Sequence, residues 1–173
     1  MKSLCKSVLI CSILCLFFSA AYTQSSIDVV LRKYKNDEGV TTVKYEGDNL
    51  NKLINKSKKN FKTQLDYVDI IGLRKKNDLS DKDKNTVSNI LKNQQFEELI
   101  NVKSKEGKVK IHTLYQNDVI NKIYAQLQSE EFGNYHAILS GKIHLEELGD
   151  ILSNLNIKEL DFLKMASTGK ESK

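Results

Sequence analysis

Four strand candidates follow one another in the second half of the chain, with no helical pattern between them. They lie at residues 96–103, 109–115, 120–128 and 135–143. The segments between them are short and turn-like, as in the Lys-Glu-Gly sequence at residues 105–107. Short turns join antiparallel neighbours, because a parallel pair needs a crossover of about a dozen residues. This half therefore predicts an antiparallel meander, with a turn that needs φ > 0 at Gly107.

The first half of the chain alternates helical and extended patterns. Apolar residues at helical spacing predict helices that begin after Ser26, at Asp48 and at Ser80, and a Leu-rich helix follows over residues 145–155. Strands are expected at residues 40–45 and 67–73. The second of these is apolar on both faces and therefore central, and Gly72 inside it indicates a bulge or a close backbone approach.

These elements predict one α+β domain over residues 25–165, followed by a polar tail at residues 166–173. We expect a single mixed or antiparallel sheet of about six strands, with three or four helices packed mainly on one face. No repeat or linker in the sequence argues for a second domain.

The first 24 residues have the pattern of a secretory signal. Lys2 and Lys6 precede an apolar stretch at residues 8–18, and small residues at positions 19–21 offer a cleavage site. Cys5, Cys11 and Cys15 all lie inside this segment. We therefore expect an exported protein, periplasmic or at the cell surface, with no Cys-based site and no stable membrane span after cleavage.

The charge pattern argues against a nucleic-acid partner. The formal net charge is +5, and Arg32 and Arg74 are the only arginines. Arginine supplies the bidentate contacts that phosphates and bases favour. The Lys-rich segments at residues 56–59 and 103–110 are therefore interpreted as solvated faces that protect a sheet edge.

Residues 81–85, Asp-Lys-Asp-Lys-Asn, begin like a calcium loop. That loop needs Gly at its sixth position and Glu at its twelfth, where this chain has Thr86 and Lys92. The better interpretation is acidic side chains in the first turn of a helix.

The remaining candidates for chemistry are three histidines, a serine and adjacent carboxylates. His112, His136 and His144 are not spaced as metal ligands and are interpreted as surface or rim residues, although a site shared by His112 and His136 stays open. Ser140-Gly141 lacks the pattern of a nucleophile elbow. Pairs such as Glu97-Glu98, Glu130-Glu131 and Glu146-Glu147 diverge in space. The sequence therefore assigns no catalytic, metal or cofactor residue and implies no cofactor.

Two stretches from Phe96 onward carry a family resemblance: FEELINVKSKEGKVKIHTLYQNDVINKIYAQL and YHAILSGKIHLEELGDI. They resemble the secreted Bacteroidetes family catalogued as domain of unknown function 4252, and the resemblance covers roughly residues 26–155. It implies a small exported domain of Gram-negative bacteria without an established activity. It also implies an envelope-signalling context, because such genes often lie near those of extracytoplasmic-function sigma factors.

The leading hypothesis is a non-enzymatic exported module that binds an envelope protein or a small ligand in envelope signalling. One alternative is a small hydrolase or cation-dependent enzyme that uses His112 or His136 with nearby carboxylates. The other is a structural component that assembles with itself through a sheet edge or the last helix. The oligomeric state is left open by the sequence.

Overall fold

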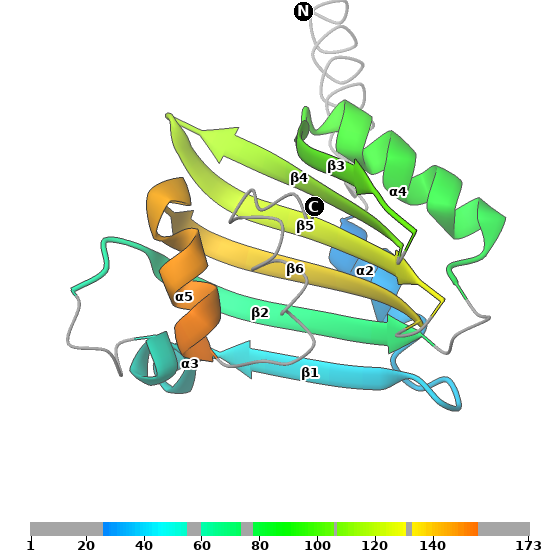
Figure 1. Ribbon diagram of the computed structural model, residues 1–173, viewed down its shortest axis with the longest axis horizontal. Helices are drawn as coiled ribbons and strands as arrows, with labels where there is room; N and C mark the ends of the chain where they lie inside the picture. Colours follow the sequence, from blue (N-terminus) through cyan, green and yellow to red (C-terminus); the bar gives the residue numbers. More distant parts are fainter. Residues whose placement is uncertain (1–25, 55–59, 74–77, 106, 131–132, 156–173) are drawn as a thin grey trace, which may run out of the picture.

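The computed structural model describes residues 26–54, 60–73, 78–105, 107–130 and 133–155. Within these ranges the chain forms six strands, four α-helices and one 3-10 turn (Figure 1). The strands are β1 (Thr41–Glu46), β2 (Gln64–Leu73), β3 (Glu97–Lys103), β4 (Lys108–Gln116), β5 (Val119–Ser129) and β6 (Gly133–Ile143). The helices are α2 (Ile27–Arg32), α3 (Gly47–Ile54), α4 (Asp81–Asn93), the 3-10 turn η1 (Leu145–Glu147) and α5 (Leu148–Leu155).

The strands form one antiparallel sheet in the order β1-β2-β6-β5-β4-β3. The α+β class and the C-terminal meander are therefore confirmed, since β3 to β6 pair consecutively. Strand β2 lies between β1 and β6, which agrees with its apolar residues on both faces. Strands β1 and β3 are the two edges.

The helices cover both faces of the sheet, two on each side, rather than mainly one face as expected. Helices α3 and α5 pack with Val68 and Ile70 of β2 in one core. Helices α2 and α4 pack with Ile71 and Leu73 of the same strand in a second core. Successive side chains of a strand point to opposite faces, so a strand with apolar residues on both faces needs a cover on each side.

Local interactions explain where the elements begin and how closely they approach. The Ser80 hydroxyl oxygen accepts from the backbone N–H of Asp83 at 3.2 Å, which confirms the predicted cap of α4. Helix α3 begins at Gly47, so Asp48 lies in its first turn rather than at the cap. A Cβ at Gly72 would lie 2.5 Å from the ring of Tyr135, so the close backbone approach is confirmed.

The predicted signal at residues 1–24 and the tail at residues 166–173 lie outside the described residues. Within the described ranges, no helix is long and apolar enough to cross a membrane.

Candidate functional site

A groove of about 330 Å³ lies between α4 and the sheet. Strands β4 and β5 supply its floor, α4 supplies its roof, and Asp78, just before α4, lines it as well. The lining residues are Asp78, Lys84, Val87, Ser88, Leu91, Lys108, Lys110, His112, Gln126 and Gln128.

The floor follows from the alternation along β4. Lys108, Lys110 and His112 point into the groove, whereas Val109 and Ile111 pack in the core with α3 and α5. The alternation is as predicted, but the interpretation of Lys108 and Lys110 as solvated edge residues is wrong. Strand β3 lies outside β4 and helix α4 lies above it, so both lysines are half-buried.

His112 is a neutral, mostly buried ring in this floor. Its side chain is 13% exposed. Burial lowers its pKa below 6.5. The negative charge of Glu98, whose Oε2 lies 3.9 Å from Nε2, raises the pKa in part, and the positive charge of Lys110 lowers it further. The ring is therefore uncharged at neutral pH, and its Nδ1 has no hydrogen-bond partner within the described residues.

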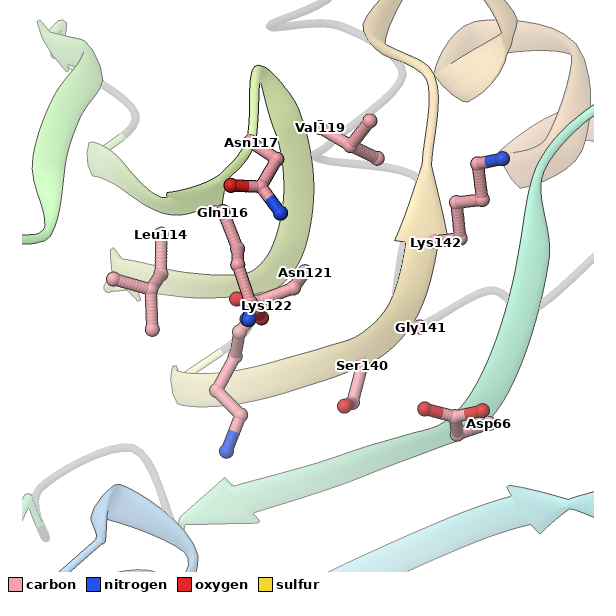
Figure 2. A pocket seen from close by; sticks show the side chains of 10 residues that line it. All are labelled: Asp66, Leu114, Gln116, Asn117, Val119, Asn121, Lys122, Ser140, Gly141 and Lys142. Carbon is pink, nitrogen blue, oxygen red and sulfur yellow. The ribbon is translucent and has the colours of Figure 1, made fainter.

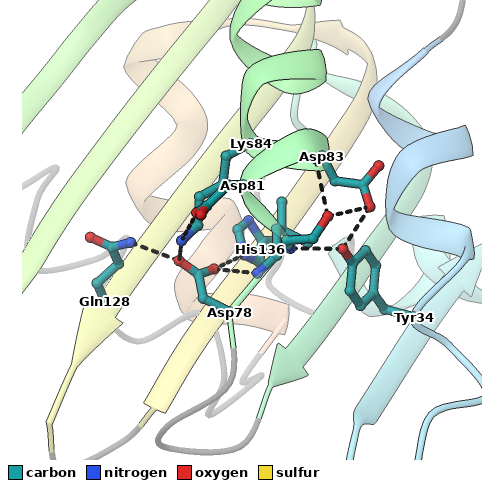
Figure 3. Close-up of polar contacts among 9 residues, drawn as sticks. Tyr34, Asp78, Asp81, Asp83, Lys84, Gln128 and His136 are labelled. Carbon is teal, nitrogen blue, oxygen red and sulfur yellow. Dashed lines mark hydrogen bonds and ion pairs between the residues drawn. The ribbon is translucent and has the colours of Figure 1, made fainter.

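A buried hydrogen-bond relay lies next to the groove (Figure 3). His136 is 2% exposed, with its Nδ1 2.8 Å from the Tyr124 hydroxyl and its Nε2 3.3 Å from Asp78 Oδ1. Because Asp78 is ionised and can only accept, the Nε2–H of His136 donates to it, while Nδ1 is hydrogen-bonded to the Tyr124 hydroxyl. Burial alone would raise the pKa of Asp78, but hydrogen bonds from His136, Leu79 and Lys84 outweigh it and hold that pKa well below 3.8.

Asp78 also joins the relay to the groove. Its Oδ2 accepts from Lys84 Nζ at 3.1 Å and from Gln128 Nε2 at 3.2 Å. Lys84 belongs to α4 and Gln128 to β5, so this carboxylate connects the roof of the groove to its floor.

A second set of contacts fixes the start of α4. Asp83 accepts from Lys33 Nζ at 2.6 Å and from the Tyr34 hydroxyl at 2.7 Å, both just beyond α2. The hydrogen bond from Lys33 is the main reason that the pKa of Asp83 falls to about 2. Together with Asp78, this carboxylate holds the first turn of α4 in place above the sheet.

The structure brings two of the three histidines together. His112 and His136 stack on either side of Tyr124, with ring centroids 6.4 Å and 6.1 Å from it. His136 is buried, so its interpretation as a surface or rim residue is wrong. His144 lies apart from both, because its backbone N–H donates to Thr63 Oγ1 at the start of β2.

The other sequence candidates are used within the fold. Asp81 is almost fully exposed in the first turn of α4, in keeping with the helix-start interpretation of residues 81–85. Ser140 hydrogen-bonds to Tyr67, and Glu147 accepts from the backbone N–H of Lys62 and Thr63. In the part of the chain that the structure describes, no three His, Cys, Asp or Glu side chains gather to hold a metal ion.

A larger pocket of about 610 Å³ lies elsewhere on the sheet (Figure 2). Several of its polar side chains pair with one another or with residues nearby. Asn121 donates to Gln116 at 3.0 Å, and Lys122 pairs with Asp28 at 3.1 Å. In the groove, Lys108 and Lys110 are half-buried and have no ion-pair partner among the described residues, whereas Asp66 and Lys142 of the larger pocket are exposed. The groove is therefore the stronger candidate for a binding site.

Sequence reasoning missed Asp78, Tyr124 and the two glutamines of the groove. For Tyr124 and the two glutamines the signal was present in strand β5, where Tyr124, Gln126 and Gln128 alternate with apolar residues. That pattern predicts one polar face, but it does not show that the face lies beneath a helix.

Comparison with known proteins places the chain in a family. The family model described as Domain of unknown function (DUF4252) matches residues 34–151. No curated protein and no solved structure matches the chain.

Proposed function

This chain belongs to the DUF4252 family, and we propose from its own residues that it is a non-enzymatic ligand-binding module of the cell envelope. The observation that supports this is the groove under α4. Lys108 and Lys110 are half-buried there without an ion-pair partner among the described residues, and His112 Nδ1 is buried without a hydrogen bond. Polar groups in such positions cost free energy unless a partner satisfies them, and a bound ligand is such a partner.

The ligand of this groove is a small molecule. A volume of about 330 Å³ lies near the lower end of the roughly 300–1,000 Å³ of small-molecule pockets. The groove also combines apolar side chains of α4, Val87 and Leu91, with a few polar groups on the floor. That combination is typical of sites that fix the orientation of one ligand.

The relay beneath the groove favours binding over catalysis. Both ring nitrogens of His136 are engaged, and its 2% exposure keeps a substrate away from it. Tyr124 is fully buried, and burial raises the pKa of its hydroxyl. These groups therefore hold the groove in shape rather than transfer protons to a substrate. Of the three histidines, only His112 lines the groove itself.

Native mass spectrometry of the protein purified from its own cells tests this function. We expect a retained small molecule that is lost in Ser88→Trp, which fills the groove, and kept in Asn89→Trp. Ser88 and Asn89 are neighbouring exposed residues of α4, but only Ser88 lines the groove. Equal retention by both variants would refute the groove as the binding site.

Export to the envelope rests on the sequence of residues 1–24. Cell fractionation with N-terminal sequencing tests it, and we expect an envelope protein whose first residue lies between positions 22 and 25. A role in envelope signalling further requires a protein partner. Crosslinking with the tagged mature chain as bait is expected to capture one specific envelope protein. If fractionation instead finds this chain uncleaved in the cytoplasm, export to the envelope is wrong, and if crosslinking captures no specific protein, the signalling role is wrong.

A further inference from the structure

We propose that the groove under α4 binds a small dianion, either a phosphomonoester or a dicarboxylate. This inference rests on the ligand-binding function proposed above. Its first ground is charge, because three lysines and one aspartate line the groove: Lys84, Lys108, Lys110 and Asp78. They leave an excess of two positive charges. Glu98 is half-exposed on the edge strand β3 and does not line the groove.

The positions of the lysines fit a ligand with two negative charges. Lys108 and Lys110 are alternate residues of β4, so their Cα atoms lie about 7 Å apart on the same face. Lys84 lines the groove from α4, on the opposite side, but its Nζ is paired with Asp78 Oδ2 at 3.1 Å and with Asp81 Oδ1 at 3.7 Å. The excess positive charge therefore lies on the two floor lysines. A doubly charged molecule pairs with both of them, whereas a single negative charge leaves one unpaired.

Partial burial strengthens this attraction. Coulomb interactions grow as the local dielectric falls, and both floor lysines are half-buried. Lysine ammonium groups are compact charges with three donors each, and they do not impose the planar geometry of an arginine fork. The groove therefore selects for charge, and it accepts tetrahedral phosphate and planar carboxylate alike.

The uncharged groups on the floor suit the rest of such a ligand. The Gln128 amide nitrogen is committed to Asp78, and the Gln126 side chain hydrogen-bonds to Tyr124, so both amides are held in place. Neutral His112 lines the floor beside them and adds no charge to it. The charge of the floor is therefore that of its two lysines.

Isothermal titration calorimetry of the mature chain tests the charge preference with four probes: succinate, inorganic phosphate, acetate and glucose. We expect at least one of the two dianions to bind with Kd below about 1 mM, and acetate to bind at least about tenfold more weakly. Glucose is expected not to bind. Tighter binding of phosphate identifies a phosphomonoester, and tighter binding of succinate identifies a dicarboxylate.

Lysine variants then locate the binding. Lys108→Gln and Lys110→Gln keep most of the side chain and are each expected to weaken binding of the dianion about tenfold. Lys103→Gln is the matched control, since Lys103 belongs to the same Lys-rich segment but is exposed on β3. Circular dichroism confirms that each variant is folded.

Either of two results overturns the inference. The first is that neither dianion binds with a Kd below about 1 mM. The second is that Lys103→Gln weakens binding as much as Lys110→Gln does. The proposed function fails separately. If native mass spectrometry finds a molecule that Ser88→Trp displaces, while neither dianion binds, the groove remains a binding site and its dianionic class is wrong.

Discussion

The relay under the groove makes a quantitative prediction for Tyr124→Phe. This change removes one hydroxyl group and leaves the aromatic ring in the core. In the wild-type protein that hydroxyl is hydrogen-bonded to His136 Nδ1 at 2.8 Å and also to Gln126. The variant leaves His136 Nδ1 buried without its hydrogen-bond partner, because His136 is only 2% exposed.

The size of the effect follows from the burial. A buried polar group that loses its partner costs about 1–3 kcal/mol of stability. For a domain of this size each kcal/mol lowers Tm by roughly 3 °C, so we expect a fall of about 3–9 °C. Tyr115→Phe is the control, because Tyr115 lies on β4 with 39% of its surface exposed, and its effect is expected to stay within about 0.5 kcal/mol.

Urea denaturation of the mature chain, followed by circular dichroism at pH 7, measures both changes. Equal slopes of the unfolding free energy against urea would show that the variants differ in stability alone. If Tyr124→Phe were as stable as Tyr115→Phe, the hydroxyl would not be satisfying His136, and the described relay would be incorrect.

Three further predictions concern the fold around the groove. Gly107→Val is expected to lower Tm in a thermal melt, since Gly107 has φ of 155° and a Cβ there would overlap the Gln128 carbonyl; an unchanged Tm would contradict the turn assignment. Leu152→Ala is expected to cost about 2–5 kcal/mol in urea denaturation, because Leu152 is fully buried between α5 and the sheet. Asp83 has a pKa of about 2, below its unfolded value of about 3.9, so its contribution is complete above about pH 5 and is lost as the pH falls toward 2. A urea midpoint that falls less steeply with acid in Asp83→Asn than in wild type checks this sign, and identical slopes would contradict it.

The meander could be predicted from sequence because its determinants are local. Short turns fix the antiparallel pairing of neighbours, and the alternation along β4 separates Ile111 from His112. The cap of α4 is equally local, since Ser80 and Asp83 lie one helical turn apart. In each case the residues that decide the structure lie within a few positions of one another.

The groove could not be predicted because its determinants lie far apart in the chain. Asp78 and His136 are 58 residues apart, and Lys33 and Asp83 are 50 residues apart. Whether Lys110 faces solvent or the underside of a helix depends on where α4 packs, and that depends on these distant contacts. The expectation that the helices pack mainly on one face was wrong for the same reason. The sequence of β2 shows that both faces need a cover, but which helices supply each cover depends on contacts between distant residues.

The most direct test of the groove as a dianion site uses two histidines as reporters, one in the groove and one outside it. Side-chain NMR spectra of the mature chain are recorded during titration with the tighter-binding of succinate and inorganic phosphate. Since His112 lines the groove and His144 lies beside Thr63, just before β2, we expect saturable shifts of the His112 resonances with those of His144 unchanged. Shifts at His144 as large as those at His112, or no shift at His112 at saturating probe, would contradict it.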